Sequence, residues 1–313
     1  MFSFDTGSGP RIVLEDERFL VAYKPPRLHT APQEGGGDSL AAWVFRERPA
    51  ARFETPRPGG PAQGGRASEG GLFHRLDFET SGLVLFALDP EALASLAASQ
   101  ESGLVEKAYR ARASVSLLAQ EGARPGRGCP LGLGRDVWDR ALSAAASASS
   151  VGQTAGGAAD ACAAAADDDS EACGAARLAA LAELARLCSG RGVESRFRPF
   201  GKGGARVACL SPDEPGPRGG GRRSHGSPGT VYATAIASMD PLPGVEGCVE
   251  IVAVIRRGFR HQIRAQLAWL GLPLLGDALY GGLSFPRLCL HAEALTFPHP
   301  ADGSLVRVNL SGQ

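Results

Sequence analysis

The sequence predicts an α+β fold, in which short strands are separated by single helices. Strand-like apolar runs recur from one end of the chain to the other, and between them lie segments with helical periodicity. The strand-like runs lie at about residues 11–15, 18–23, 83–88, 105–115, 230–237, 248–255, 287–292 and 305–310. With 313 residues, 43% of them apolar, the chain can bury a full core in one large or two modest domains.

The first elements are bounded by residues that stop or start regular structure. Arg11–Glu15 and Arg18–Tyr23 are predicted strands, and Lys24 with the two prolines behind it ends the second, because proline cannot donate to a ladder. Asp38 or Ser39 is expected to cap a helix with one apolar face. The Pro- and Gly-rich stretch that follows, residues 54–71, predicts a loop.

The next elements alternate between strand and helix. Residues 83–88 form a continuous apolar run, typical of a buried strand. Asp89-Pro90-Glu91 is a strong helix start, with a capping side chain and proline at the first helical position, and the helix is expected to end at Gly103. Val105–Val115 is predicted as a strand that places Lys107 and Tyr109 on one face.

The middle of the chain is expected to be an insertion. Residues 120–229 are rich in Ala, Gly and Arg, with some helix, and would separate residues 1–119 and 230–313 as two parts of one domain. Within the insertion, 141–174 is biased enough to be a flexible tract, although Ala-rich sequence also forms helix. Ala175–Cys188 carries leucines spaced by three and is the better helix.

Charge and cysteine content exclude several classes of protein. The net charge is zero, but residues 191–264 hold twelve Lys or Arg against six Asp or Glu, which is the footprint of a surface that binds an anionic partner. Seven cysteines without paired spacing argue against a disulfide scaffold or a structural zinc site, so we expect a cytoplasmic protein without metal. Neither a membrane-spanning run nor a signal peptide is expected.

A carboxylate stands directly before the apolar run at 83–88. The segment His74-Arg75-Leu76-Asp77 is followed by Thr80-Ser81-Gly82-Leu83, so Asp77 would lie at the mouth of a sheet. One interpretation is local, because Asp, Thr, Ser and Gly are common turn residues, and Thr80 and Ser81 would then bond to nearby backbone groups. The other interpretation is catalytic.

The catalytic interpretation comes from a resemblance to the RluA-type pseudouridine synthases. The segment around Asp77 is similar to the signature of that family, and five further segments match it in order. They are Tyr23–Leu28, Lys107-Ala108-Tyr109, Gly258–Leu270, Pro273–Gly281 and Leu288–Ala292. The resemblance implies a mixed, mostly antiparallel sheet with flanking helices and a central active-site cleft, and an enzyme that isomerises uridine in RNA.

Site residues follow from the same resemblance. Asp77 would be the nucleophile, Arg264 its ion-pair partner, and Tyr109 would lie against the uracil ring. The residues expected to contact substrate are Arg75, Leu290, Arg260, His261 and Lys24. Lys24 is either a phosphate contact or a surface lysine at the end of a strand, and Leu290 is either a base contact or a core residue. His74 and His291 are expected to satisfy internal hydrogen bonds.

This sequence departs from the family at three positions. Arg27 replaces a glycine, Phe259 occupies the usual arginine position with Arg260 one place later, and Gln266 stands where histidine is common. The acid, the tyrosine and Arg264 are all present.

Partners and competing functions complete the prediction. The expected partner is ribosomal or transfer RNA, without a cofactor and without a membrane, and the protein is expected to be a monomer. One alternative is a catalytically inactive RNA-binding protein with the same fold. Another is a glycosidase-like hydrolase, which needs a second carboxylate about 5–10 Å from the first, and Glu79 is the nearby candidate.

Overall fold

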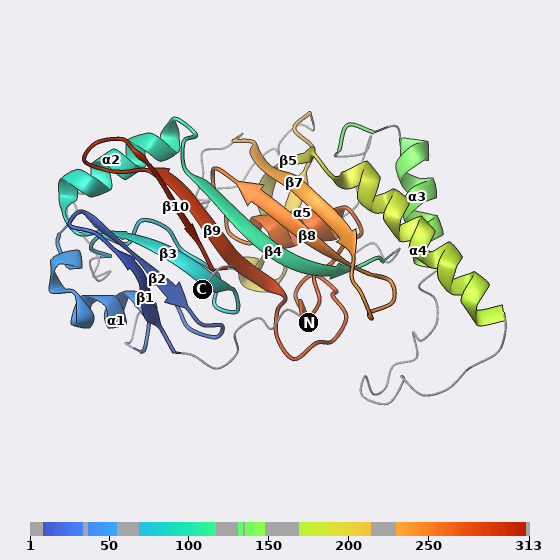
Figure 1. The fold of residues 1–313 in the computed structure, drawn as a ribbon, viewed down its shortest axis with the longest axis horizontal. Helices are drawn as coiled ribbons and strands as arrows, with labels where there is room; N and C mark the ends of the chain where they lie inside the picture. Colours follow the sequence, from blue (N-terminus) through green and yellow to red (C-terminus); the bar gives the residue numbers. More distant parts are fainter. Residues whose placement is uncertain are drawn as a thin grey trace. The chain divides into compact units, whose positions relative to one another are not determined.

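The protein is described by a computed structural model that covers residues 9–33, 37–54, 69–116, 131–133, 135–147, 169–213 and 230–310 (Figure 1). Most of the described strand pairs are antiparallel and a few helices lie between the strands in sequence, so the predicted α+β class is confirmed. The chain divides into two compact units, Met1–Tyr109 with Leu290–Gln313, and Arg110–Cys289. The insertion predicted at 120–229 stays a prediction. Most of the predicted loop at 54–71 and of the tract at 141–174 lies outside the described residues.

The first unit is built on a sheet in the order β1-β2-β3-β9, with β10 paired to β9. Its strands are β1 (Arg11–Glu15), β2 (Phe19–Lys24), β3 (Ser81–Ala87), β9 (Leu290–Pro298) and β10 (Leu305–Asn309). The pairs are antiparallel except β3 with β9, which are parallel. Its helices are α1 (Leu40–Glu47), η1 (Pro49–Ala51) and α2 (Pro90–Glu101).

Both helices of the first unit begin where the sequence predicts. The Ser39 hydroxyl accepts the amide N–H of Ala42 at 3.1 Å, and the Asp89 carboxylate accepts that of Ala92 at 2.8 Å. One face of α2 packs on β3 and β9 and closes a core of apolar side chains from the strands. This core fixes β3, and β3 fixes the segment that precedes it.

The second unit begins within β4 (Glu106–Ser114), the strand that carries the chain out of the first unit. Its other strands are β5 (Arg191–Phe200), β6 (Arg206–Leu210), β7 (Tyr232–Pro241) and β8 (Cys248–Ile255). Its helices are α3 (Arg135–Ser147), α4 (Asp169–Cys188), η2 (Lys202–Gly204) and α5 (Gln262–Trp269). The strands lie in the order β8-β7-β5-β6, all antiparallel; α4 packs on β7, and α3 packs on α4 (Figure 1).

Strands β5 and β6 lie within the segment predicted as an insertion and were not predicted. The sequence of β5 is charged and contains Gly and Pro, and β6 has an apolar run of only four residues beside the Pro- and Gly-rich segment that follows it. They are strands because β5 pairs with β7 and β6 pairs with β5. Helix α5 holds this arrangement through buried Gln266, whose side-chain amide donates to Ser195 Oγ at 3.0 Å and to the Tyr232 carbonyl at 2.9 Å.

Among the helices described, none has the length and apolar character needed to cross a membrane.

Candidate active site

Asp77 lies in a tight turn four residues before β3, as the sequence predicts. Its backbone carbonyl accepts the amide N–H of Thr80 at 3.1 Å, and β3 begins at Ser81 with every residue buried. Gly82 is required here, because it has φ of 125° and a Cβ on it would lie 2.2 Å from the carbonyl oxygen of Ala292 on β9. The turn is therefore fixed by a strand that is itself clamped between β2 and β9.

The two hydroxyls that follow Asp77 have different surroundings. Thr80 is buried, and its hydroxyl has no hydrogen-bond partner within the described ranges. The Ser81 hydroxyl lies 2.8 Å from Nδ1 of His291. The segment is held instead by Thr30, whose hydroxyl donates to the Leu76 carbonyl at 2.7 Å and accepts the Leu76 N–H at 3.1 Å. The Thr80 hydroxyl therefore does not make the local bond that the turn interpretation expects, and the internal role expected for His291 is confirmed.

Lys24 is a positioning residue and neither of the two things predicted. Its side chain is fully buried, and its ammonium donates to the carbonyls of Pro25 at 2.9 Å, Leu28 at 2.8 Å and Phe78 at 3.2 Å. A buried ammonium that holds three carbonyls is not placed to contact a phosphate, which corrects its assignment to substrate binding. The bond to Phe78 fixes the residue that follows Asp77.

Replacing Lys24 with methionine is expected to lower the free energy of unfolding by about 3 kcal/mol, because three part-buried carbonyls lose a charged donor. The measurement is the urea midpoint of Lys24→Met, with Lys202→Met, an exposed lysine, as the matched control. Equal midpoints for the two variants would show that the three bonds contribute nothing to stability.

Tyr109 lies close enough to Asp77 for the two groups to interact electrostatically. The tyrosine side chain is buried on β4, and its pKa is raised well above the usual range, first by that burial and second by the negative charge of Asp77. The phenol is therefore un-ionised at neutral pH. Leu290 is buried at the start of β9, next to His291, which is in register with Ser81.

A second buried cation lies two residues from Tyr109. Burial lowers the pKa of Lys107 to about 8, and its Nζ donates to Gln100 Oε1 at 2.9 Å. The pKa of His74 is lowered well below its usual range by burial and then by the charge of Lys107. Nε2 of His74 accepts the Leu85 N–H at 3.3 Å, which confirms the internal role predicted for this histidine.

The depressed pKa of Lys107 predicts a pH-dependent stability. Between the folded pKa of about 8 and the usual value of 10.5, the unfolded chain binds more protons, so the contribution of Lys107 to stability rises with pH. The free energy of unfolding of the wild type minus that of Lys107→Met is expected to increase from pH 8 to pH 10.5 and to be constant below pH 7. Urea unfolding at each pH measures this difference, and a flat profile contradicts the prediction.

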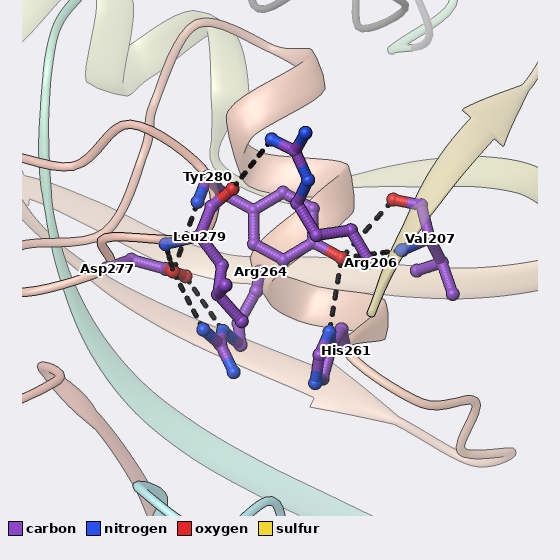
Figure 2. Close-up of polar contacts among 7 residues, drawn as sticks. All are labelled: Arg206, Val207, His261, Arg264, Asp277, Leu279 and Tyr280. Carbon is purple, nitrogen blue, oxygen red and sulfur yellow. Dashed lines mark hydrogen bonds and ion pairs between the residues drawn. The ribbon is translucent and has the colours of Figure 1, made fainter. Parts of the chain in front are cut away.

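Arg264 has a partner that the sequence did not reveal. Its Nε donates to Asp277 Oδ2 at 2.8 Å and its Nη2 to Oδ1 at 2.7 Å, and both side chains are almost completely buried (Figure 2). This bidentate pair lies within the second unit, whereas the sequence assigned Arg264 to Asp77. The correction is that Asp277 is the carboxylate that fixes the guanidinium; a role for Arg264 toward Asp77 stays a prediction.

The turn that carries Asp277 also joins α5 to β6 (Figure 2). Asp277 Oδ1 accepts the N–H groups of Leu279 and Tyr280 at 3.1 and 3.2 Å. The Tyr280 hydroxyl lies 3.0 Å from the Val207 N–H, 3.2 Å from the Val207 carbonyl and 3.2 Å from Nδ1 of His261. His261, which precedes α5 with φ of 56°, is thereby held to the edge of the sheet. The Asp-x-x-Tyr spacing at 277–280 was the only sequence signal for this network.

The two remaining predicted cations are exposed. Arg75 makes an ion pair with Glu69, and its side chain is 54% exposed. Arg260 donates to the backbone carbonyls of Gly204 and Arg206. Both guanidinium groups are therefore at the surface of their units, where a solvent-side partner can reach them.

Comparison with known proteins first defines the class of the fold. The structure of human RNA Pseudouridylate Synthase Domain Containing 4 is similar to 96% of this chain, with a TM-score of 0.52 and 15% sequence identity, and the match covers 87% of that chain. A likeness at this identity shows the fold alone, which is that of a pseudouridine synthase domain.

The sequence then shows which family the chain resembles. Residues 18–125 match RNA pseudouridylate synthase. The Dual-specificity RNA pseudouridine synthase RluA of Haemophilus influenzae is 40% identical over 72 residues, 22% of this chain and 32% of that protein. The protein of the same name from Escherichia coli K12 is 47% identical over 51 residues, 15% and 23% of the two chains. The resemblance to the RluA-type pseudouridine synthases is thus confirmed, although the chain spans only a quarter to a third of the length of these relatives.

Proposed function

We propose that this protein isomerises specific uridines to pseudouridine in structured RNA, ribosomal or transfer RNA, with Asp77 as the nucleophile. One observation supports the proposal most strongly. The carboxylate stands in a fixed turn before a buried strand, and its charge acts on the buried phenol of Tyr109. An acid and an aromatic ring held together in this way suit a planar base that must be detached and rejoined.

The reaction conserves all atoms of the uridine except one exchanged hydrogen. The target leaves its stack, at a cost of a few kcal/mol that is lower in loops. The N1–C1′ bond breaks, with Asp77 attacking the sugar or the base, and the uracil turns so that a C5–C1′ bond forms. The hydrogen on C5 leaves as a proton, N1 takes up a proton, and the carboxylate departs. Neither oxidant nor cofactor is needed for this balance.

Other residues take supporting roles in the proposal. Arg264, held by Asp277, would keep the carboxylate of Asp77 ionised. Tyr109 would lie against the uracil face and take or return a proton, with Leu290 packed on the base. Arg75, Arg260 and His261 would contact the RNA, since guanidinium groups recognise phosphates and stack on bases. A monomeric state, a cytoplasmic location and the absence of a metal stay predictions.

The test is tritium release from RNA that carries 5-tritiated uridine. The full-length protein is incubated with ribosomal and transfer RNA transcripts, and the RNA is then digested and searched for pseudouridine. Release with pseudouridine in the digest supports the proposal. RNA binding without any release supports an inactive RNA-binding protein instead, and free uracil supports the hydrolase with Glu79 as second carboxylate.

A further inference from the structure

Three aromatic rings meet at the surface of the second unit. Phe197 on β5 and Phe259 before α5 stack with ring centroids 4.8 Å apart and planes at 2°. The ring of Tyr232 on β7 is 5.7 Å from Phe197 and 5.0 Å from Phe259. All three residues are partly exposed. We call Phe197, Tyr232 and Phe259 the aromatic platform.

Strand register explains why these rings reach solvent. Ser195 on β5 pairs with Tyr232 on β7, so both side chains lie on the face that α5 covers through Gln266. Phe197, two residues further along β5, lies on the same face. Helix α5 begins only at Gln262. The platform therefore lies on the same face of the sheet, past the N-terminal end of the helix, where α5 does not cover it. It is an apolar surface that no described helix covers.

The platform lies in a positively charged part of the surface. Arg256 and Arg257 are exposed in the segment between β8 and Phe259, and Arg260 is exposed directly after it. Arg257 is close enough to Tyr232 for its charge to act on the pKa of the phenol, which burial raises and Arg257 lowers. Aromatic faces beside guanidinium groups are how proteins hold single-stranded nucleic acid, with bases on the rings and phosphates on the cations.

We infer that the aromatic platform binds an unpaired base of the RNA and that Arg257 contacts a phosphate beside that base. The inference rests on the proposed function, since it takes RNA as the partner.

The test measures RNA affinity by fluorescence anisotropy with two labelled probes, a 12-nucleotide oligouridylate and a 12-base-pair RNA duplex. Phe259→Leu and Phe197→Leu keep apolar volume but remove a ring. Each is expected to weaken oligouridylate binding at least about fivefold and to change duplex binding less than twofold, because only unpaired bases stack on side chains. The matched control is Phe285→Leu, since Phe285 is 44% exposed and stacks on none of the three rings.

The cation is tested separately. Arg257→Gln is expected to weaken binding of both probes and to reduce the slope of log Kd against log salt by about 1, the value for one lost phosphate contact. Arg140→Gln, an exposed arginine on α3, is the control. Unfolding midpoints of the leucine variants show whether the platform still folds.

The outcomes separate this inference from the proposed function. Equal oligouridylate affinity in Phe259→Leu and Phe285→Leu, an equal loss for duplex and single strand, or no binding by the wild type overturns the inference. Tritium release by the wild type is recorded in parallel. The wild type could release no tritium while Phe259→Leu still binds oligouridylate more weakly than the wild type. In that case the inference about the aromatic platform is supported and the isomerase proposal fails.

Discussion

Replacing Asp77 with asparagine is expected to lower the single-turnover rate of tritium release from 5-tritiated uridine RNA by at least about 10³-fold. The amide keeps the size of the side chain, and the turn keeps its backbone bond between residues 77 and 80. What is lost is the anionic nucleophile on which every later step depends. The rate is measured with enzyme in excess over RNA and at a concentration well above the Kd, so that RNA affinity does not enter.

The control for this variant is Glu79→Gln, which removes the other carboxylate of the same segment and is expected to retain activity within a few-fold. RNA binding and the unfolding midpoint of Asp77→Asn are expected to match the wild type. Tritium release by Asp77→Asn would assign the chemistry to another group. If Glu79→Gln also lost activity while Asp77→Asn kept it, that group would be Glu79.

Replacing Asp277 with asparagine is expected to lower the free energy of unfolding by about 3–5 kcal/mol. The side chains of Arg264 and Asp277 are 3% and 0% exposed, so removing the carboxylate takes a buried guanidinium away from its bidentate partner. The Oδ1 atom also accepts two backbone N–H groups of the turn, and these bonds become weaker when the acceptor loses its charge. Urea unfolding of the full chain measures the change.

An exposed ion pair provides the matched control. Glu183 and Arg186 on α4 bond at 2.8 Å but are 51% and 70% exposed, so Glu183→Gln is expected to lower the free energy of unfolding far less than Asp277→Asn does. A second variant, Arg264→Met combined with Asp277→Leu, removes both charges and is expected to recover part of the loss. A loss in Asp277→Asn no larger than that in Glu183→Gln would contradict the stabilising role of the buried pair.

Much of the fold was predictable because its signals are local. Helices α1 and α2 begin where a capping side chain precedes an apolar face, and β3 overlaps the apolar run that predicted it. The turn at Asp77 was predictable for the same reason. Strands β5 and β6 were not, because β5 is charged, β6 is short, and they become strands by pairing with β7 and with each other.

The site divides in the same way. The sequence by itself determined that Asp77 precedes a buried strand and that Lys107 and Tyr109 share one face of β4. Only the tertiary structure decided that Asp277 holds Arg264 and that Lys24 is buried against three carbonyls. The physical reason is that capping and periodicity act within a few residues of chain. The partner of a buried charge is instead chosen by which groups packing excludes from water together.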